Sequence, residues 1–273
     1  MKTTEKYKLI AFDIDGTIKA TNKDISNQMI CSISRANKLG AKITVITGRS
    51  YLSAKDVVSQ IDLSVPIVSF QGAHIANPIT DQVYWKKIID NISLKKLINI
   101  LEKYDNEILF YTEKEIFTNK ISTWNNNYSK RNNTIINVLK DFNELNDMEI
   151  IRITVICPSG AKQFSRFLKN EIKNDLYVTS SLANFCEILN PDAGKTNGLK
   201  TLASMLNIDK KNILSFGNSN EDLGMLDWSG HGVIVEDNNI KLENNTLNHC
   251  LSVTQNGPSI YLNQLIDENY IGI

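Results

Sequence analysis

Two aspartates spaced two residues apart, Asp13 and Asp15, stand where the first apolar run of the chain gives way to Gly16 and Thr17. Residues 8–14 are predicted to form a buried strand, and the period-two geometry of a strand places both carboxylates on the same side. Gly16 permits the sharp turn that must follow. Paired carboxylates suit nucleophilic and acid–base chemistry, although an Asx-type turn that closes the strand would use the same residues.

A second polar group follows the next predicted strand, at residues 41–47. Thr47, Gly48 and Arg49 supply a hydroxyl, an unhindered backbone N–H and a cation. This trio suits an anion held at the N-terminus of a helix. An ordinary helix cap formed by Thr47 is the alternative.

Two further groups lie late in the chain. Lys195 follows a glycine at the start of a predicted helix, like the end of a P-loop, but that motif requires glycine at position 189, where Leu189 stands. The P-loop is therefore excluded, and Lys195 is either a site cation or a surface lysine. Residues 217–222 follow another buried strand and include Glu221 and Asp222, which could bind a ligand or simply favour the first turn of a helix.

All four groups lie beside the ends of predicted strands. The strands are 8–14, 41–47, 66–70, 212–216 and 232–235, and the helices are 25–39, 51–61, 195–206 and 221–228. Strands separated by helices of this length imply βαβ units and a parallel sheet. Ligands bind beyond the carboxyl ends of such strands, so the four groups are expected to converge there.

The middle of the chain differs in pattern and is predicted to be an inserted domain. It contains a hairpin from residues 108–112 and 116–118, a strand at 149–157, a helix at 159–172 and Asn-rich loops around 124–133. We therefore expect an α/β protein with a Rossmann-like parallel-sheet core at 1–78 and 188–273. The smaller α+β insertion, at 79–187, would be a cap.

Composition excludes several classes of protein. The 273 residues include 30 basic and 30 acidic side chains, and this balance argues against a nucleic-acid-binding protein. No apolar run approaches the roughly 18 residues of a membrane span, and the N-terminus lacks a signal-peptide pattern. The four cysteines form no CxxC pair, which fits a reducing compartment. We expect a cytoplasmic globular protein without a membrane partner.

The ordered set of groups resembles the haloacid dehalogenase superfamily of phosphohydrolases, and most closely its Cof-like branch, which has a class IIB cap. The resemblance covers essentially the whole chain. Besides the four groups it includes residues 70–73, 187–190 and 254–257.

The resemblance implies a Mg²⁺-dependent phosphatase. Asp13 would be the nucleophile that forms an aspartyl-phosphate, and Asp15 the general acid and then the general base. Thr47, Gly48 and Lys195 would bind the phosphate of the substrate. The metal ligands would be drawn from Asp13, Asp15, Asn218, Glu221 and Asp222, and Arg49 and Asn190 could contact the substrate.

The fourth motif departs from the family pattern, GDxxND. Position 218 is asparagine where the family has aspartate, and position 221 is glutamate where the family has asparagine. A neutral amide oxygen binds a hard cation more weakly than a carboxylate. This departure keeps a second interpretation open, a catalytically weak protein that binds a phosphometabolite, and a phosphomutase is a third.

Specificity is expected to come from the cap. Candidate lining residues are Trp124, Asn126 and Arg131, although a mobile polar loop would have the same composition. The expected substrate is a small phosphate ester, such as a sugar phosphate or a phosphorylated cofactor. The expected oligomeric state is a monomer or a homodimer.

Overall fold

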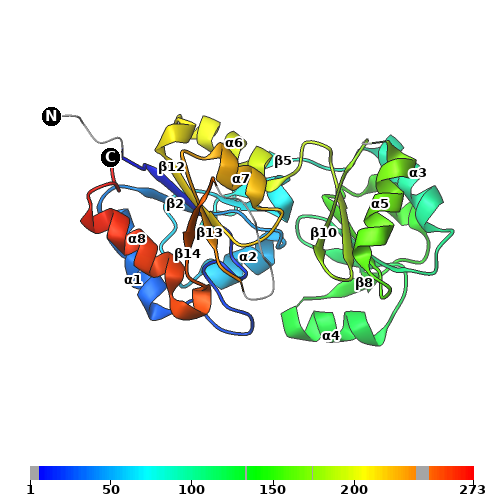
Figure 1. Ribbon diagram of the computed structural model, residues 1–273. Helices are drawn as coiled ribbons and strands as arrows, with labels where there is room; N and C mark the ends of the chain where they lie inside the picture. The colour runs from blue at the N-terminus through cyan, green and yellow to red at the C-terminus, as the bar shows by residue number, and fades with distance from the viewer. Residues whose placement is uncertain (1–5, 133, 174, 238–245) are drawn as a thin grey trace. The chain divides into compact units, whose positions relative to one another are not determined.

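The computed structural model describes residues 6–132, 134–173, 175–237 and 246–273 (Figure 1). The chain divides into two compact units. The first consists of Met1–Tyr84 and Gly194–Ile273, and the second of Trp85–Ala193. The second unit therefore begins and ends six residues later in the chain than the expected insertion at 79–187.

A five-stranded parallel sheet forms the centre of the first unit. Its order is β14-β13-β12-β1-β2, with bounds Asn248–Cys250, His231–Val235, Ile213–Gly217, Leu9–Phe12 and Lys42–Val45. The register pairs Phe12 of β1 with Phe216 and with Val45, so these three strands end level with one another. The carboxyl ends of the strands that precede Asp13, Thr47 and Asn218 therefore meet at one edge, and the predicted α/β core is confirmed.

The described residues of this unit form five helices. They are α1 (Asn27–Lys38), α2 (Tyr51–Val58), α6 (Lys195–Met205), α7 (Leu223–Trp228) and α8 (Gly257–Asp267). Figure 1 shows α1 and α8 together on one face of the sheet and α6 and α7 on the other. The Ser26 hydroxyl caps α1 by accepting from the Met29 N–H, and Ser32 of α1 lies 2.7 Å from Ser259 of α8.

Short elements complete the first unit. Strands β3 (Ile67–Ser69), β4 (His74–Ala76) and β5 (Val83–Lys86) form a small sheet, and β5 runs across the boundary into the second unit. A parallel bridge between Ile46 and Val68 joins β3 to the end of β2. The 3₁₀ turns of this unit are η1 (Phe70–Gly72), η3 (Lys210–Asn212) and η4 (Val253–Gln255).

The second unit contains a six-stranded sheet in the order β10-β11-β9-β6-β7-β8. In that order the strands span Tyr177–Leu182, Phe185–Leu189, Arg152–Ile156, Glu107–Tyr111, Ile116–Thr118 and Ile136–Val138. The helices are α3 (Asn91–Leu101), α4 (Thr123–Asn132) and α5 (Ala161–Ile172), and η2 (Phe142–Asp147) is a 3₁₀ turn. The predicted hairpin is confirmed as β6 and β7, which pair antiparallel. One face of the sheet packs with α3 and α5 into an apolar core that includes Phe110, Ile153 and Leu168.

The prediction of loops around residues 124–133 is wrong for most of that stretch, because Thr123–Asn132 form helix α4; residue 133 lies outside the described residues. Asparagine is a poor helix former, but local contacts offset this. Ser122 and Asn125 cap the helix start reciprocally, since the Ser122 hydroxyl accepts from the Asn125 N–H and the Asn125 side chain accepts from the Ser122 N–H, both at 3.1 Å. Trp124 stacks on Tyr128 one turn later, with ring centroids 5.1 Å apart.

Within the described ranges, no helix combines the length and the apolar character needed to cross a membrane.

Candidate active site

Asp13 lies directly after β1 and is buried, with 5% of its surface exposed. Its N–H donates to the Phe216 carbonyl at 3.0 Å, which continues the pairing of β1 with β12 by one residue. Its Oδ2 lies 3.3 Å from the Thr17 hydroxyl, and the same hydroxyl lies 3.1 Å from Oδ1 of Asn218. Thr17 thus links the first and the fourth predicted groups.

Lys195, the first residue of α6, is buried between two carboxylates. Its Nζ donates to Oδ1 of Asp13 at 2.6 Å and to Oδ1 of Asp222 at 2.7 Å. Burial raises the pKa of the Asp13 carboxyl to about 7, although the Lys195 charge opposes this rise. Burial lowers the pKa of the Lys195 ammonium, but the charges of Asp13 and Asp222 outweigh that effect and raise it.

Asp222 holds the loop that follows β12. Its Oδ2 accepts from the N–H groups of Asn218 and Ser219, at 3.1 and 2.9 Å, and from the Ser219 hydroxyl at 2.7 Å. A Cβ at Gly217 would lie 2.5 Å from the Asp222 side chain, so a glycine is needed for this close approach. Both oxygens of Asp222 are therefore engaged within the protein.

Asn218 follows β12, and its side chain lies between the segments that follow the neighbouring strands β1 and β13. It packs on the loop after Asp13, since a Cβ at Gly16 (φ +85°) would lie 2.1 Å from the Asn218 amide nitrogen. The same nitrogen donates to Oδ2 of Asp237 at 3.4 Å. Asp237 follows the end of β13 and thus reaches the same edge of the sheet as Asp13.

The oxygens of this cluster suit a hard cation. Asp13 Oδ2 and Asn218 Oδ1 both lie within reach of the Thr17 hydroxyl, so a carboxylate and an amide oxygen are close together. Such oxygens are the ligands that Mg²⁺ prefers. Among the described residues, however, no group of three or more His, Cys, Asp or Glu side chains is arranged to hold a metal. The donor set therefore fits Mg²⁺ only if the amide oxygen of Asn218 takes part.

Asp15 forms a bidentate ion pair with Arg49. Nε and Nη2 of Arg49 each lie 2.7 Å from a different oxygen of Asp15, and Nη1 donates to the Ser53 hydroxyl at 3.0 Å. The Asp15 side chain is 53% exposed, in contrast to buried Asp13. The two predicted catalytic carboxylates thus lie in opposite environments.

The Thr47–Gly48 turn is tied to the start of α6 through Gln71. Gln71 has positive φ (53°); its N–H donates to the Thr47 carbonyl at 3.0 Å, and its own carbonyl accepts from the Gly194 N–H at 2.6 Å. A Cβ at Gly48 would lie 2.5 Å from the Gln71 amide nitrogen. The predicted phosphate-binding residues Thr47, Gly48 and Lys195 are therefore held in one backbone framework.

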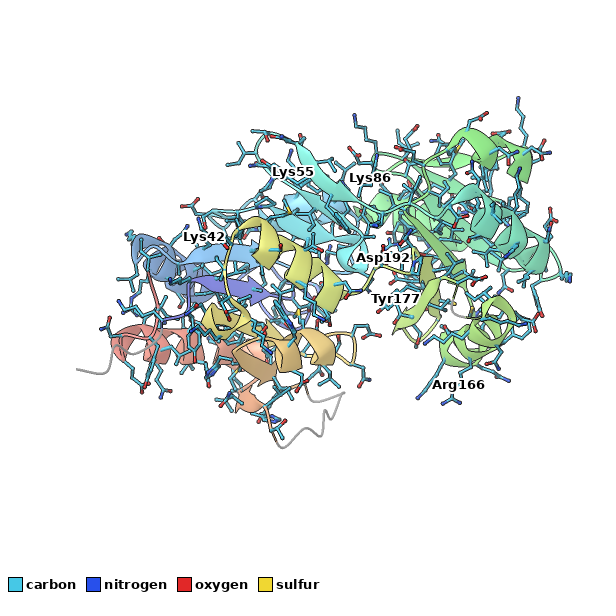
Figure 2. The ribbon with its side chains drawn as sticks, turned by 90° about the horizontal axis from the view of Figure 1, so that it is seen from above. Lys42, Lys55, Lys86, Arg166, Tyr177 and Asp192 are labelled. Carbon is cyan, nitrogen blue, oxygen red and sulfur yellow. The ribbon has the colours of Figure 1, made fainter. Side chains whose placement is uncertain are left out.

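Two further predicted residues, Asn190 and Glu221, lie in different units of the chain. Asn190 belongs to the second unit, where its amide donates to the Ile88 carbonyl at 2.8 Å and its oxygen accepts from the Asp192 N–H. Asp192, labelled in Figure 2, pairs with Lys87 at 2.7 Å. Glu221 is half-buried beside Asp222.

The proposed lining residues Trp124, Asn126 and Arg131 are all on α4 in the second unit. Asn126 is exposed, and the Arg131 side chain lies outside what the structure describes. Trp124 also contacts Phe185, edge to face, with centroids 5.4 Å apart.

Four residues that hydrogen-bond to the predicted site residues were not predicted as part of the site from the sequence: Thr17, Gln71, Ser219 and Asp237. Asp237 carries a detectable signal, since it is a carboxylate two residues after the predicted strand 232–235 at the edge where ligands bind. The hydrogen bonds of Thr17, Gln71 and Ser219 depend on residues distant in sequence or on loop shape.

Comparison with known proteins agrees with this geometry. The model of the haloacid dehalogenase-like hydrolases matches residues 10–261. The 5-amino-6-(5-phospho-D-ribitylamino)uracil phosphatase YwtE of Bacillus subtilis is 25% identical over 291 residues, covering 96% of this chain and 99% of that protein. A haloacid dehalogenase-like hydrolase from B. subtilis has a similar structure, with a TM-score of 0.82 at 22% identity, covering 94% and 99% of the two chains. The subclass IIB sugar phosphatase BT4131 gives 0.79 at 20% identity, with coverage of 94% and 98%.

Proposed function

The chain belongs to the haloacid dehalogenase-like hydrolase family and is a phosphoric monoester hydrolase of that family, and we propose that it dephosphorylates small metabolites through an aspartyl-phosphate on Asp13. The observation that carries this proposal is the buried contact of Lys195 with both Asp13 and Asp222. A carboxylate attacks a phosphate dianion poorly unless nearby cations offset the repulsion.

In the first step Asp13 attacks phosphorus, the ester P–O bond breaks, and Asp15 gives its proton to the leaving alcohol. In the second step Asp15 takes a proton from water, which attacks the aspartyl-phosphate and releases phosphate and free Asp13. Arg49 is placed to orient Asp15, because its guanidinium binds both carboxylate oxygens.

Lys195, Thr47 and Gly48 would bind the oxygens of the transferred phosphoryl group. The Thr47 oxygen accepts from the Arg49 N–H at 3.2 Å, which leaves the hydroxyl proton to be donated to a ligand. Lys195 offers three protons, two of which are directed to Asp13 and Asp222. The third is available for a phosphate oxygen.

A bound Mg²⁺ would neutralise negative charge on the phosphate and on Asp13. Asp13, the backbone carbonyl of Asp15 and the amide oxygen of Asn218 would hold it, with Glu221 as a further acidic residue of the loop. Because both oxygens of Asp222 accept hydrogen bonds within the protein, Asp222 would contribute by holding Lys195 and the loop in place.

The second unit would act as the cap that selects the substrate. The relatives described above include a phosphatase of a phosphorylated ribitylamino-uracil and a sugar phosphatase, which favours sugar phosphates or phosphorylated cofactor precursors as substrates. We place the reaction in the cytoplasm, in a monomer or a homodimer.

Asn218 motivates one competing function, that of a weakly active protein that binds a phosphometabolite. The pairing of Lys195 with Asp13 favours turnover, because a binding protein has no need of a buried nucleophile. A phosphomutase would share the first step and return the phosphoryl group to a sugar.

Phosphate release from a panel of sugar and cofactor phosphates, with Mg²⁺ and with EDTA, tests the proposal. We expect metal-dependent release that Asp13→Asn abolishes, whereas Asp24→Asn, an exposed carboxylate of the same unit, retains it. Appreciable hydrolysis by folded Asp13→Asn would exclude Asp13 as the nucleophile. A mutase would instead transfer the phosphoryl group between sugars with little free phosphate.

A further inference from the structure

Asp237 contacts the side chain that departs from the family pattern. Strands β12 and β13 are parallel neighbours with Gly217 opposite Ile234, so Asn218 and Asp237 both leave the sheet at its carboxyl edge. Asn218 is buried, with 5% exposed, and its Nδ2 lies 3.4 Å from Oδ2 of half-buried Asp237.

This contact decides which end of the Asn218 amide faces Asp13. An amide has a donor end and an acceptor end, and an ionised carboxylate can only accept. Asp237 therefore selects the NH₂ end, and Oδ1 is left 3.1 Å from the Thr17 hydroxyl, which also reaches Asp13. The reverse orientation would turn the NH₂ group toward any cation at Asp13 and repel it.

Asp237 also supplies charge. A carboxylate that accepts from a ligand's N–H increases the negative charge on the ligating atom, and removing such a partner commonly weakens metal binding about 10–100-fold. Asp222 cannot replace it, since its oxygens already accept from Lys195, Ser219 and the backbone.

We propose that Asp237 is the positioning residue that makes Asn218 a metal ligand, by fixing its amide with Oδ1 toward Asp13 and by restoring a negative charge one hydrogen bond away from the ion. This inference rests on the proposed function, because it takes Mg²⁺ as the ion.

The test is a calorimetric titration of Mg²⁺ into the full-length protein. We compare the wild type, Asp237→Asn, Asn218→Asp and the double variant, and confirm folding by thermal melting. Asp237→Asn should weaken the Mg²⁺ Kd at least about tenfold. In the Asn218→Asp background the same exchange should leave the Kd unchanged or tighten it, because a carboxylate at 218 has no donor end to orient. Glu236→Gln, which removes the same charge from the adjacent exposed residue, should bind as the wild type does.

An unchanged Kd in Asp237→Asn would overturn the inference, and so would equal weakening in both backgrounds, which would indicate a general charge effect. Phosphate release by the wild type separates these outcomes from failure of the proposed function. Metal-dependent release together with an unchanged Kd in Asp237→Asn overturns the positioning role alone. A wild-type protein that binds no Mg²⁺ overturns both the positioning role and the metal requirement.

Discussion

Asp13 and Lys195 form a buried ion pair in which Nζ lies 2.6 Å from Oδ1, although 182 residues separate them in the chain. The pair exists because β1 ends immediately before Asp13 and α6 begins at Lys195. Strand β1 thus positions the carboxylate, and the first turn of α6, which follows the insertion, positions the cation.

Lys195→Met should impair both stability and activity. Removing the ammonium leaves Asp13 and Asp222 buried without their cation, which should lower the free energy of unfolding by about 3–5 kcal/mol. Loss of the cation beside the phosphate should lower kcat at least about 100-fold. Urea unfolding and phosphate release measure the two effects. Lys200→Met, an exposed lysine of the same helix, is the matched control, and equal behaviour of the two variants would contradict the assigned role.

Gly72→Ala should disturb the site through the backbone. Gly72 has φ +90°, and a Cβ there would lie 2.2 Å from the Gly194 carbonyl oxygen, directly before Lys195. We expect a drop in kcat and a loss of more than about 2 kcal/mol of stability. Gly160 also has positive φ (+109°), but a Cβ there meets nothing within 4 Å, so Gly160→Ala isolates the cost of the dihedral angle. If both variants keep wild-type kcat, the contact with Gly194 does not position Lys195.

Arg49→Met should lower kcat about tenfold with little effect on folding. The variant frees the Asp15 carboxyl, so the proposed acid is less often in position, whereas half-exposed ion pairs contribute about 0.2–1 kcal/mol to stability. Lys55→Met removes another surface ion pair, with Asp81 at 2.6 Å, and is the control (Figure 2). Full activity of Arg49→Met would show that Asp15 needs no such partner.

His231 should make stability depend on pH. Its ring nitrogens lie 2.8 Å from the hydroxyls of Tyr7 and Tyr261, and burial lowers the pKa of the imidazole. Below the unfolded pKa of about 6.5 the unfolded chain binds more protons than the folded one, so stability falls as pH falls. Urea unfolding at pH 7.5 and 5.5 should show a larger loss for the wild type than for His231→Gln. The same exchange at exposed His249 should leave the loss at its wild-type size; an unchanged loss in His231→Gln would assign the pH dependence to other groups.

Much of the core follows from local patterns. Apolar runs bounded by helices are enough to predict β1, β2 and β12 and to place Asp13, Thr47 and Asn218 at one sheet edge, because strand period and helix length depend on nearby residues. Helix α4 is missed because its capping and its Trp124–Tyr128 stacking outweigh poor asparagine propensity.

The partners of single side chains are harder to predict. Asp222 is expected among the possible metal ligands, yet its oxygens bind Lys195 and the backbone of its own loop. Asp237 emerges only when the register of β12 and β13 is known. Both cases depend on the spatial meeting of distant segments, which hydropathy does not encode.

The loop after β12 owes its path to Asp222 rather than to residue 218, since one Asp222 oxygen accepts from two successive backbone N–H groups. The chemical identity of residue 218 can therefore change during evolution without moving the position it occupies. The hydrogen bonds of Asp222 therefore set the backbone path of this loop, whereas the side chain at position 218 sets the charge that the loop presents to the site.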